Sequence, residues 1–196
     1  MPYKELLSVI AVALTFLAFW PYIRSIHKGA TRPHVFSWVI WGAVTFIVAL
    51  AQLADGAGVG AWPIALSGLI TFYVAYLAYR RRGDMTITRL DWTFLSLALT
   101  SLPLWYLTHD PLWAVVVLTG VDLLGFGPTF RKAYRFPFEE QASFFALAAL
   151  RNFVVLGALE NYTLTTMLFP AAVGGVCVIF IAMLAYRRRQ LSLQST

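Results

Sequence analysis

Seven apolar stretches follow one another along the chain and limit what it can fold into. They cover residues 6–22, 35–53, 62–79, 92–107, 112–130, 142–159 and 164–186, and Gly, Pro, Asp or basic residues separate them. A helix needs about 20 mostly apolar residues to cross a bilayer. A barrel strand would instead alternate polar and apolar residues over about ten positions, and these stretches do not alternate. We therefore predict an all-α, polytopic membrane protein with seven transmembrane helices and the lipid bilayer as its surroundings.

Composition excludes the other broad classes of protein. Of 196 residues, 60% are hydrophobic and only 12% are charged, whereas about a quarter of the residues of a soluble domain are charged. The single cysteine, Cys177, permits neither an internal disulfide nor a cysteine-based metal site. The sequence carries no nucleophile-elbow, zinc-protease or phosphate-loop motif. We expect no enzyme activity, no cofactor and no metal.

The basic residues predict the orientation in the membrane. Thirteen of the fifteen Lys and Arg residues lie in four clusters at 24–32, 80–89, 131–135 and 187–189, which share one side if the helices alternate. By the positive-inside rule that side is cytoplasmic, so the N-terminus is predicted outside and the C-terminus inside, with the plasma (inner) membrane as the location. The net charge of +6 thus follows membrane topology and does not indicate nucleic acid.

An internal repeat divides the chain. The hexamer Leu-Ala-Tyr-Arg-Arg-Arg at 77–82 recurs at 184–189, an offset of 107. The same offset pairs Leu17 with Leu124, Pro21 with Pro128, Arg24 with Arg131 and Pro63 with Pro170. We predict a first three-helix repeat over 1–82, a linker helix over 83–110, a second repeat over 111–189 and a tail over 190–196. Three crossings end on the side opposite to where they began, so a second triplet that followed directly would be inverted. The linker helix adds one crossing and restores the orientation, which gives a 3+1+3 bundle of parallel repeats.

The two repeat turns resemble a known family. Residues 21–31, Pro-Tyr-Ile-Arg-Ser-Ile-His-Lys-Gly-Ala-Thr, and 127–132, Gly-Pro-Thr-Phe-Arg-Lys, resemble the proline, hydrophobic and basic turn of the SWEET, SemiSWEET and PQ-loop superfamily. Tyr22 and Thr129 stand where that family has glutamine, and Ala171 stands where sugar-carrying members have asparagine.

The resemblance implies a transporter that moves a small metabolite, a sugar or a small organic anion, by alternating access between two triple-helix bundles. It also implies that Pro21 and Pro128 are hinges; the alternative is that each proline is simply tolerated near a helix end. A different class of function stays open, a SWEET-fold receptor or membrane-complex assembly subunit that does not transport. Because both triplets are present in one chain, an oligomer is not required.

Asp122 and Arg151 are the most informative residues, since each lies in the middle of an apolar stretch. A charge at that depth costs at least about 2.5 kcal/mol on insertion scales, so each needs a partner or a wet cavity, and we expect them to pair. One interpretation is a structural ion pair that locks two helices together. The other is a substrate site, in which Arg151 receives an anionic group and Asp122 neutralises it or carries a proton.

Further candidates for substrate binding are Asn152, Ser67, Thr71 and Trp41. Asn152 is next to Arg151, and Ser67 and Thr71 share a predicted helix. The alternative for the hydroxyls is a hydrogen bond to a carbonyl of their own helix. Trp41 lies three residues after Trp38, so the two share a helix face. Two interpretations stay open for Trp41: it lines a ligand cavity, or it packs in the core.

Overall fold

The computed structural model describes residues 2–29, 33, 35–81, 85, 87–135, 137–139 and 142–194. These residues form helices α1 (Pro2–His27), α2 (Val35–Ala54), η1 (Gly58–Ala61), α3 (Trp62–Arg80), α4 (Arg89–Thr108), α5 (Pro111–Arg135), η2 (Pro137–Glu139), α6 (Ala142–Ala158) and α7 (Leu164–Gln194). The predicted all-α class is therefore confirmed for the part of the chain that is described. The short helices η1 and η2 are single 3₁₀ turns that lead into α3 and towards α6.

Within the described part of the chain, four helical segments are long and apolar enough to cross a membrane: Pro2–His27, Val35–Ala54, Gly58–Arg80 and Leu164–Ser192. Two shorter apolar helical segments are Pro111–Gly127 and Ala142–Ala158. These lengths and compositions suit a membrane-embedded protein. The full count of seven crossings stays a prediction.

Local chemistry explains where several helices begin and end. Thr88 caps α4, because its hydroxyl accepts a hydrogen bond from the Asp91 backbone N–H while the Asp91 carboxylate accepts from the Thr88 backbone N–H. The same helix ends at His109, whose φ of 55° lies in the left-handed region. Pro63 stands in the first turn of α3, where a missing N–H removes no helical hydrogen bond.

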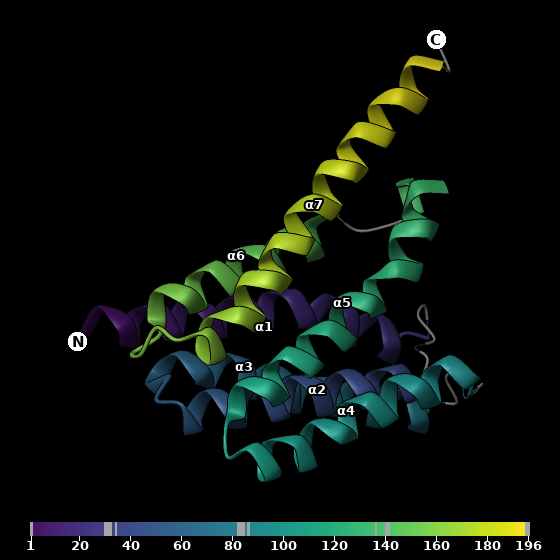
Figure 1. Cartoon of the computed structure of the whole chain (residues 1–196). Helices are drawn as coiled ribbons and strands as arrows, with labels where there is room; N and C mark the ends of the chain where they lie inside the picture. Colours follow the sequence, from purple (N-terminus) through teal and green to yellow (C-terminus); the bar gives the residue numbers. More distant parts are fainter. Residues whose placement is uncertain are drawn as a thin grey trace.

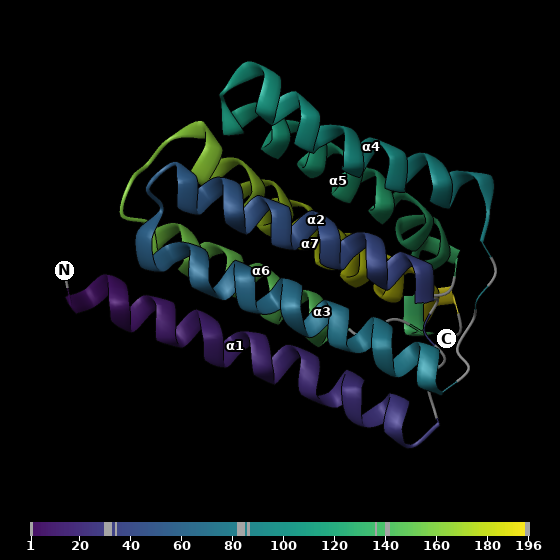
Figure 2. The same cartoon turned by 90° about the horizontal axis from the view of Figure 1, so that it is seen from below.

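The helices pack in two sets with the same internal order. In the first set α3 lies between α1 and α2, and in the second set α7 lies between α5 and α6. Figure 2 shows α1, α3 and α2 side by side in that order. The two sets meet through α1 against α6 and through α2 against α5, while α4 covers α5 and part of α2. At its C-terminal end α7 runs beyond most of the bundle (Figure 1).

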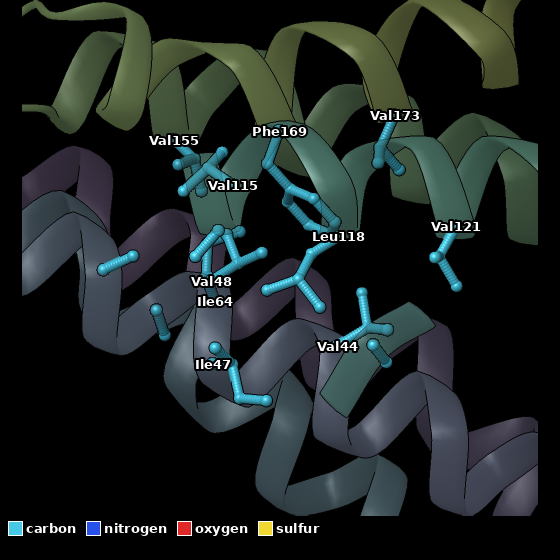
Figure 3. Close-up of a cluster of buried hydrophobic side chains, with 14 of the residues drawn as sticks. Val44, Ile47, Val48, Ile64, Val115, Leu118, Val121, Val155, Phe169 and Val173 are labelled. Carbon is cyan, nitrogen blue, oxygen red and sulfur yellow. The ribbon is translucent and has the colours of Figure 1, made fainter. Parts of the chain in front are cut away.

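The central core is aliphatic and joins both sets. Figure 3 shows Val44, Val48 and Ile64 facing Val115, Leu118 and Phe169, all of them buried. Gly68 lets α3 approach α2 closely, since a Cβ on it would lie 3.0 Å from the backbone nitrogen of Phe46. Val121 of α5 and Val173 of α7 lie toward one end of this cluster. Asp122, the next residue after Val121, is therefore held next to the core.

The predicted division into repeats falls partly outside this description. Residues 82–84, where the first repeat was predicted to give way to the linker helix, lie outside the described residues, as do 195 and 196 of the tail. Of the other two predicted boundaries, that at 110–111 coincides with the start of α5 at Pro111, and that at 189–190 falls inside α7, which continues to Gln194.

Candidate functional site

Asp122 and Arg151 are both buried in the middle of helices. Asp122 lies on α5 and Arg151 on α6, and each side chain is 8% exposed. Cys177 of α7 is 1% exposed, and all three residues lie within electrostatic range of one another. Two formal charges and a thiol thus meet inside an apolar bundle.

The expected ion pair between Asp122 and Arg151 is not formed. No hydrogen bond or ion pair joins these two residues in the structure. The backbones of α5 and α6 pack mainly against α7, and the two helices meet directly at the rings of Phe126 and Phe145, whose centroids are 6.4 Å apart. The interpretation as a structural lock between two neighbouring helices therefore lacks its contact.

Polar atoms at this site are left without protein partners. The Arg151 Nη2 donates to the Asn152 Oδ1 over 3.3 Å, but the Arg151 Nη1 is fully enclosed and has no hydrogen-bond partner. No hydrogen bond from the described residues reaches the Asp122 carboxylate, and its oxygens are not among the fully enclosed atoms, so the carboxylate touches open space. A buried donor without an acceptor costs about 1–3 kcal/mol, and more for a charged group. The site is incomplete by itself.

Asn152 is fully buried and is held by its own helix. Its Nδ2 donates to the Ala148 carbonyl over 2.8 Å, which directs the Oδ1 toward Arg151. The tight approach of α7 helps to fix it, because a Cβ on Gly174 would lie 3.3 Å from the Asn152 Cβ. Asn152 therefore positions the guanidinium of Arg151.

Thr119 belongs to the same site and was not predicted from the sequence. It lies three residues before Asp122 on α5, so the two side chains share a helix face. Its side chain is 3% exposed, and its hydroxyl is enclosed without a hydrogen-bond partner. Its i, i+3 spacing from Asp122 is the sequence signal that could have identified it.

Trp41 reaches the same stretch of α5 from α2. Its indole Nε1 would lie 3.3 Å from a Cβ on Gly125, which follows Asp122 by three residues. Trp41 makes an edge contact with Trp38, whose ring centroid is 5.6 Å away, and Trp38 is itself 4.9 Å from the ring of Tyr22. A row of aromatic rings thus leads from α1 to Gly125 of α5, one turn after Asp122, and both interpretations of Trp41, as a wall and as core packing, remain compatible with it.

Ser67 and Thr71 are not brought to this site. Both are buried on α3, which packs against α1 and α2. The Thr71 hydroxyl donates to the Ser67 carbonyl over 2.7 Å, so it bonds within its own helix. The hydroxyls of α3 therefore contribute to the interior of the first set of helices.

Of the two expected hinges, Pro21 lies inside α1, which continues past it to His27, and its side chain is exposed. Pro128 falls within α5, at a position whose side chain lies outside the described residues.

One end of the bundle is fastened by hydrogen bonds between the two sets. There the α2–α3 connection meets the α6–α7 connection: the Val59 N–H donates to the Glu160 Oε1 over 3.3 Å, and the Glu160 N–H donates to the Ala57 carbonyl over 3.0 Å. The Thr163 hydroxyl donates to the Asp55 carboxylate. We call these contacts, together with the 2.6 Å bond from the Lys4 ammonium to the Leu159 carbonyl, the loop latch.

At the basic end, two hydrogen bonds between described residues join helices of the same set. Arg81 lies 3.5 Å from the His27 ring nitrogen, linking α3 to α1, and the Arg187 Nε donates to the Tyr134 carbonyl over 3.1 Å, linking α7 to α5. The guanidinium of Arg187 also lies 4.2 Å from the centre of the Tyr134 ring.

Among the described residues, no group of three or more His, Cys, Asp or Glu side chains could hold a metal ion. In comparisons with protein-family models, curated proteins and solved structures, none matches this chain.

Proposed function

We propose that this chain is a multi-pass membrane transporter that moves a small polar metabolite, a sugar or a small organic anion, by alternating access between two bundles of three helices. The observation that carries the proposal is the pair of buried, unjoined charges, Asp122 on α5 and Arg151 on α6. Charged residues within membrane-spanning helices mark substrate or ion pathways, because their cost is otherwise hard to offset.

A substrate supplies what the protein leaves out at this site. The free Nη1 of Arg151 offers a charged donor to a carboxylate or a hydroxyl, and the hydroxyl of Thr119 and the carboxylate of Asp122 offer partners nearby. A purely structural pair would be expected to close into direct contact, since truncating or separating buried partners costs several kcal/mol. The absence of a direct contact between Asp122 and Arg151 therefore favours a binding role.

The packing order supports two bundles that rock against each other. The contacts of α1 with α3 and of α3 with α2 have their equivalents in α5 with α7 and α7 with α6. The contact of α1 with α6 is likewise equivalent to that of α5 with α2, as a pseudo-two-fold axis along the bundle requires. Parallel repeats of this kind enclose a substrate near the membrane midplane in known transporters.

In this proposal the N-terminus is outside and the C-terminus is cytoplasmic in the plasma membrane. Arg24, Arg81 and Arg187 lie at or near the C-terminal ends of α1, α3 and α7, which places them on one side, and the loop latch is on the other side. Pro21 and Pro128 are proposed to let α1 and α5 bend as the bundles rock, because a proline removes one hydrogen bond of the helical ladder.

Uptake into proteoliposomes tests the proposal. The purified protein is assayed with labelled sugars, amino acids, carboxylates and nucleosides, beside Asp122→Asn and a control, Glu5→Gln, which removes an exposed acid. Saturable uptake of one class by the wild type and by Glu5→Gln, lost in Asp122→Asn, supports a carrier. A folded, thermally stable preparation that takes up none of the four classes contradicts transport, and favours a receptor or assembly subunit.

A further inference from the structure

The charged site holds two opposite charges apart instead of joining them. Asp122 and Arg151 are buried and within electrostatic range, yet no hydrogen bond or ion pair joins them. Each charged group also lacks a hydrogen bond that it could form: among the described residues, the Arg151 Nη1 has no acceptor and the Asp122 carboxylate has no donor. A ligand complementary to this arrangement carries a negative and a positive group on one small body.

We propose that the substrate class of this site is a zwitterion, a neutral α-amino acid whose carboxylate is bound by Arg151 and whose ammonium group is bound by Asp122. This inference rests on the proposed function for the transport step and replaces the sugar or organic anion named there as substrate, but the binding that it describes does not depend on transport. The Asn152 side chain occupies one arm of the guanidinium and leaves the Nη1 for the carboxylate. The Thr119 hydroxyl, on the same helix face as Asp122, is a further acceptor for the ammonium group.

Charge balance distinguishes a zwitterion from the other classes. Asp122 and Arg151 together are neutral when both are charged, and a zwitterion leaves the occupied site neutral. An anion would leave one uncompensated negative charge in an apolar bundle, which is costly. A sugar would keep the site neutral, but its hydroxyls would form weaker bonds than a carboxylate and an ammonium group, because hydrogen bonds between charged partners are roughly twice as strong.

The wall of the site favours an apolar side chain on that amino acid. Trp41 lies against Gly125, three residues after Asp122, and Val121 and Val173 lie in the adjoining apolar cluster. These surfaces have no charge to offer a third ionic group. A neutral, apolar side chain is therefore the best match.

The test compares ligands that share a carbon skeleton and differ only in charge. Three sets are used: L-alanine with propionate and ethylamine, L-leucine with isocaproate and isoamylamine, and L-phenylalanine with hydrocinnamate and phenethylamine. Binding to the full chain in lipid nanodiscs is measured by calorimetry. In at least one set the amino acid is expected to bind at least about tenfold more tightly than either partner, since each single-charge analogue leaves one protein charge unpaired.

Two variants test which protein residue binds the ammonium group of the amino acid and which binds its carboxylate. Asp122→Asn is expected to abolish the preference for the amino acid over its carboxylate analogue, and Arg151→Gln the preference over its amine analogue. Glu5→Gln and Arg89→Gln, which remove exposed charges, are expected to bind as the wild type does. The comparison of the three ligand types on the wild type needs no variant, so it decides the question even if a variant does not fold.

The outcomes separate this inference from the proposed function. A carboxylate that binds as tightly as its amino acid, or the absence of binding by all three amino acids, overturns the zwitterion. Uptake of a sugar by a protein that binds no amino acid overturns the zwitterion and keeps the transporter. Amino-acid binding with the expected effects of both variants, but without uptake into proteoliposomes, supports the zwitterion and overturns the transporter.

Discussion

The loop latch makes a quantitative prediction at Gly58. This glycine has a φ of 58°, and a Cβ on it would overlap the side-chain carboxyl of Glu160. The substitution Gly58→Ala therefore has two costs. A side chain in the left-handed region costs about 1–2 kcal/mol, and displacing Glu160 removes its hydrogen bond from the Val59 N–H, worth about 1 kcal/mol.

Gly29 provides the matched control, because it has a φ of 71° and nothing within 4 Å of a Cβ. Gly29→Ala has only the backbone cost, so Gly58→Ala is expected to be less stable by about 1 kcal/mol, which for a chain of this size lowers the Tm by about 2–4 °C more. Thermal unfolding in detergent micelles, followed by the fraction that stays monodisperse, measures both shifts.

A double-mutant cycle checks the cause. Glu160→Ala removes the atoms that the new Cβ would overlap, so adding Gly58→Ala to Glu160→Ala is expected to cost no more than Gly29→Ala does. Equal Tm values for Gly58→Ala and Gly29→Ala, or an undiminished effect of Gly58→Ala in the Glu160→Ala background, would refute the reasoning.

Other substitutions test the packing and the hinge. Gly68→Ala is expected to destabilise the protein by about 1–3 kcal/mol, because a Cβ there meets the backbone of α2. Gly120→Ala, where a Cβ has nothing among the described residues within 4 Å, is expected to stabilise it by up to about 1 kcal/mol. The two substitutions should therefore shift the Tm in opposite directions. Phe180→Ala, which removes a fully buried ring, is expected to cost about 3–5 kcal/mol and Leu124→Ala, 61% exposed, well under 1 kcal/mol, both measured by denaturant unfolding in micelles. Pro21→Ala is expected to leave the Tm unchanged or higher and to slow uptake; unchanged uptake would remove the hinge role.

The helices could be predicted from the sequence because their apolar stretches are long and uninterrupted. Their ends were less predictable, since α1, α5 and α7 continue into polar segments, to His27, Arg135 and Gln194. Helical hydrogen bonding continues through such residues as readily as through apolar ones, so hydropathy alone places the ends too early.

The neighbours of each helix could not be predicted from hydropathy. The cost of a buried charge suggested that Asp122 and Arg151 pair, but their helices pack mainly against α7 and no ion pair forms. The burial of both charges was predictable from their positions, whereas their separation depends on packing between faces of similar apolar character. Thr119 was missed for a related reason, because most buried threonines satisfy themselves, as Thr15 does with the Ala11 carbonyl.

The length of α7 has a consequence for the choice of membrane. The helix has 31 residues, which is about 46 Å along its axis, while the hydrocarbon of a bilayer is about 30 Å thick. Its apolar part ends where Arg187 begins a basic run, so the final turns reach into the headgroups and water. In a thinner bilayer α7 would have to tilt, at a modest cost per ångström of mismatch. Because α5 and α6 pack against α7, they would move with it. The acyl-chain length of the surrounding lipids is therefore expected to change how the helices that carry Asp122 and Arg151 lie relative to each other, without any change in sequence.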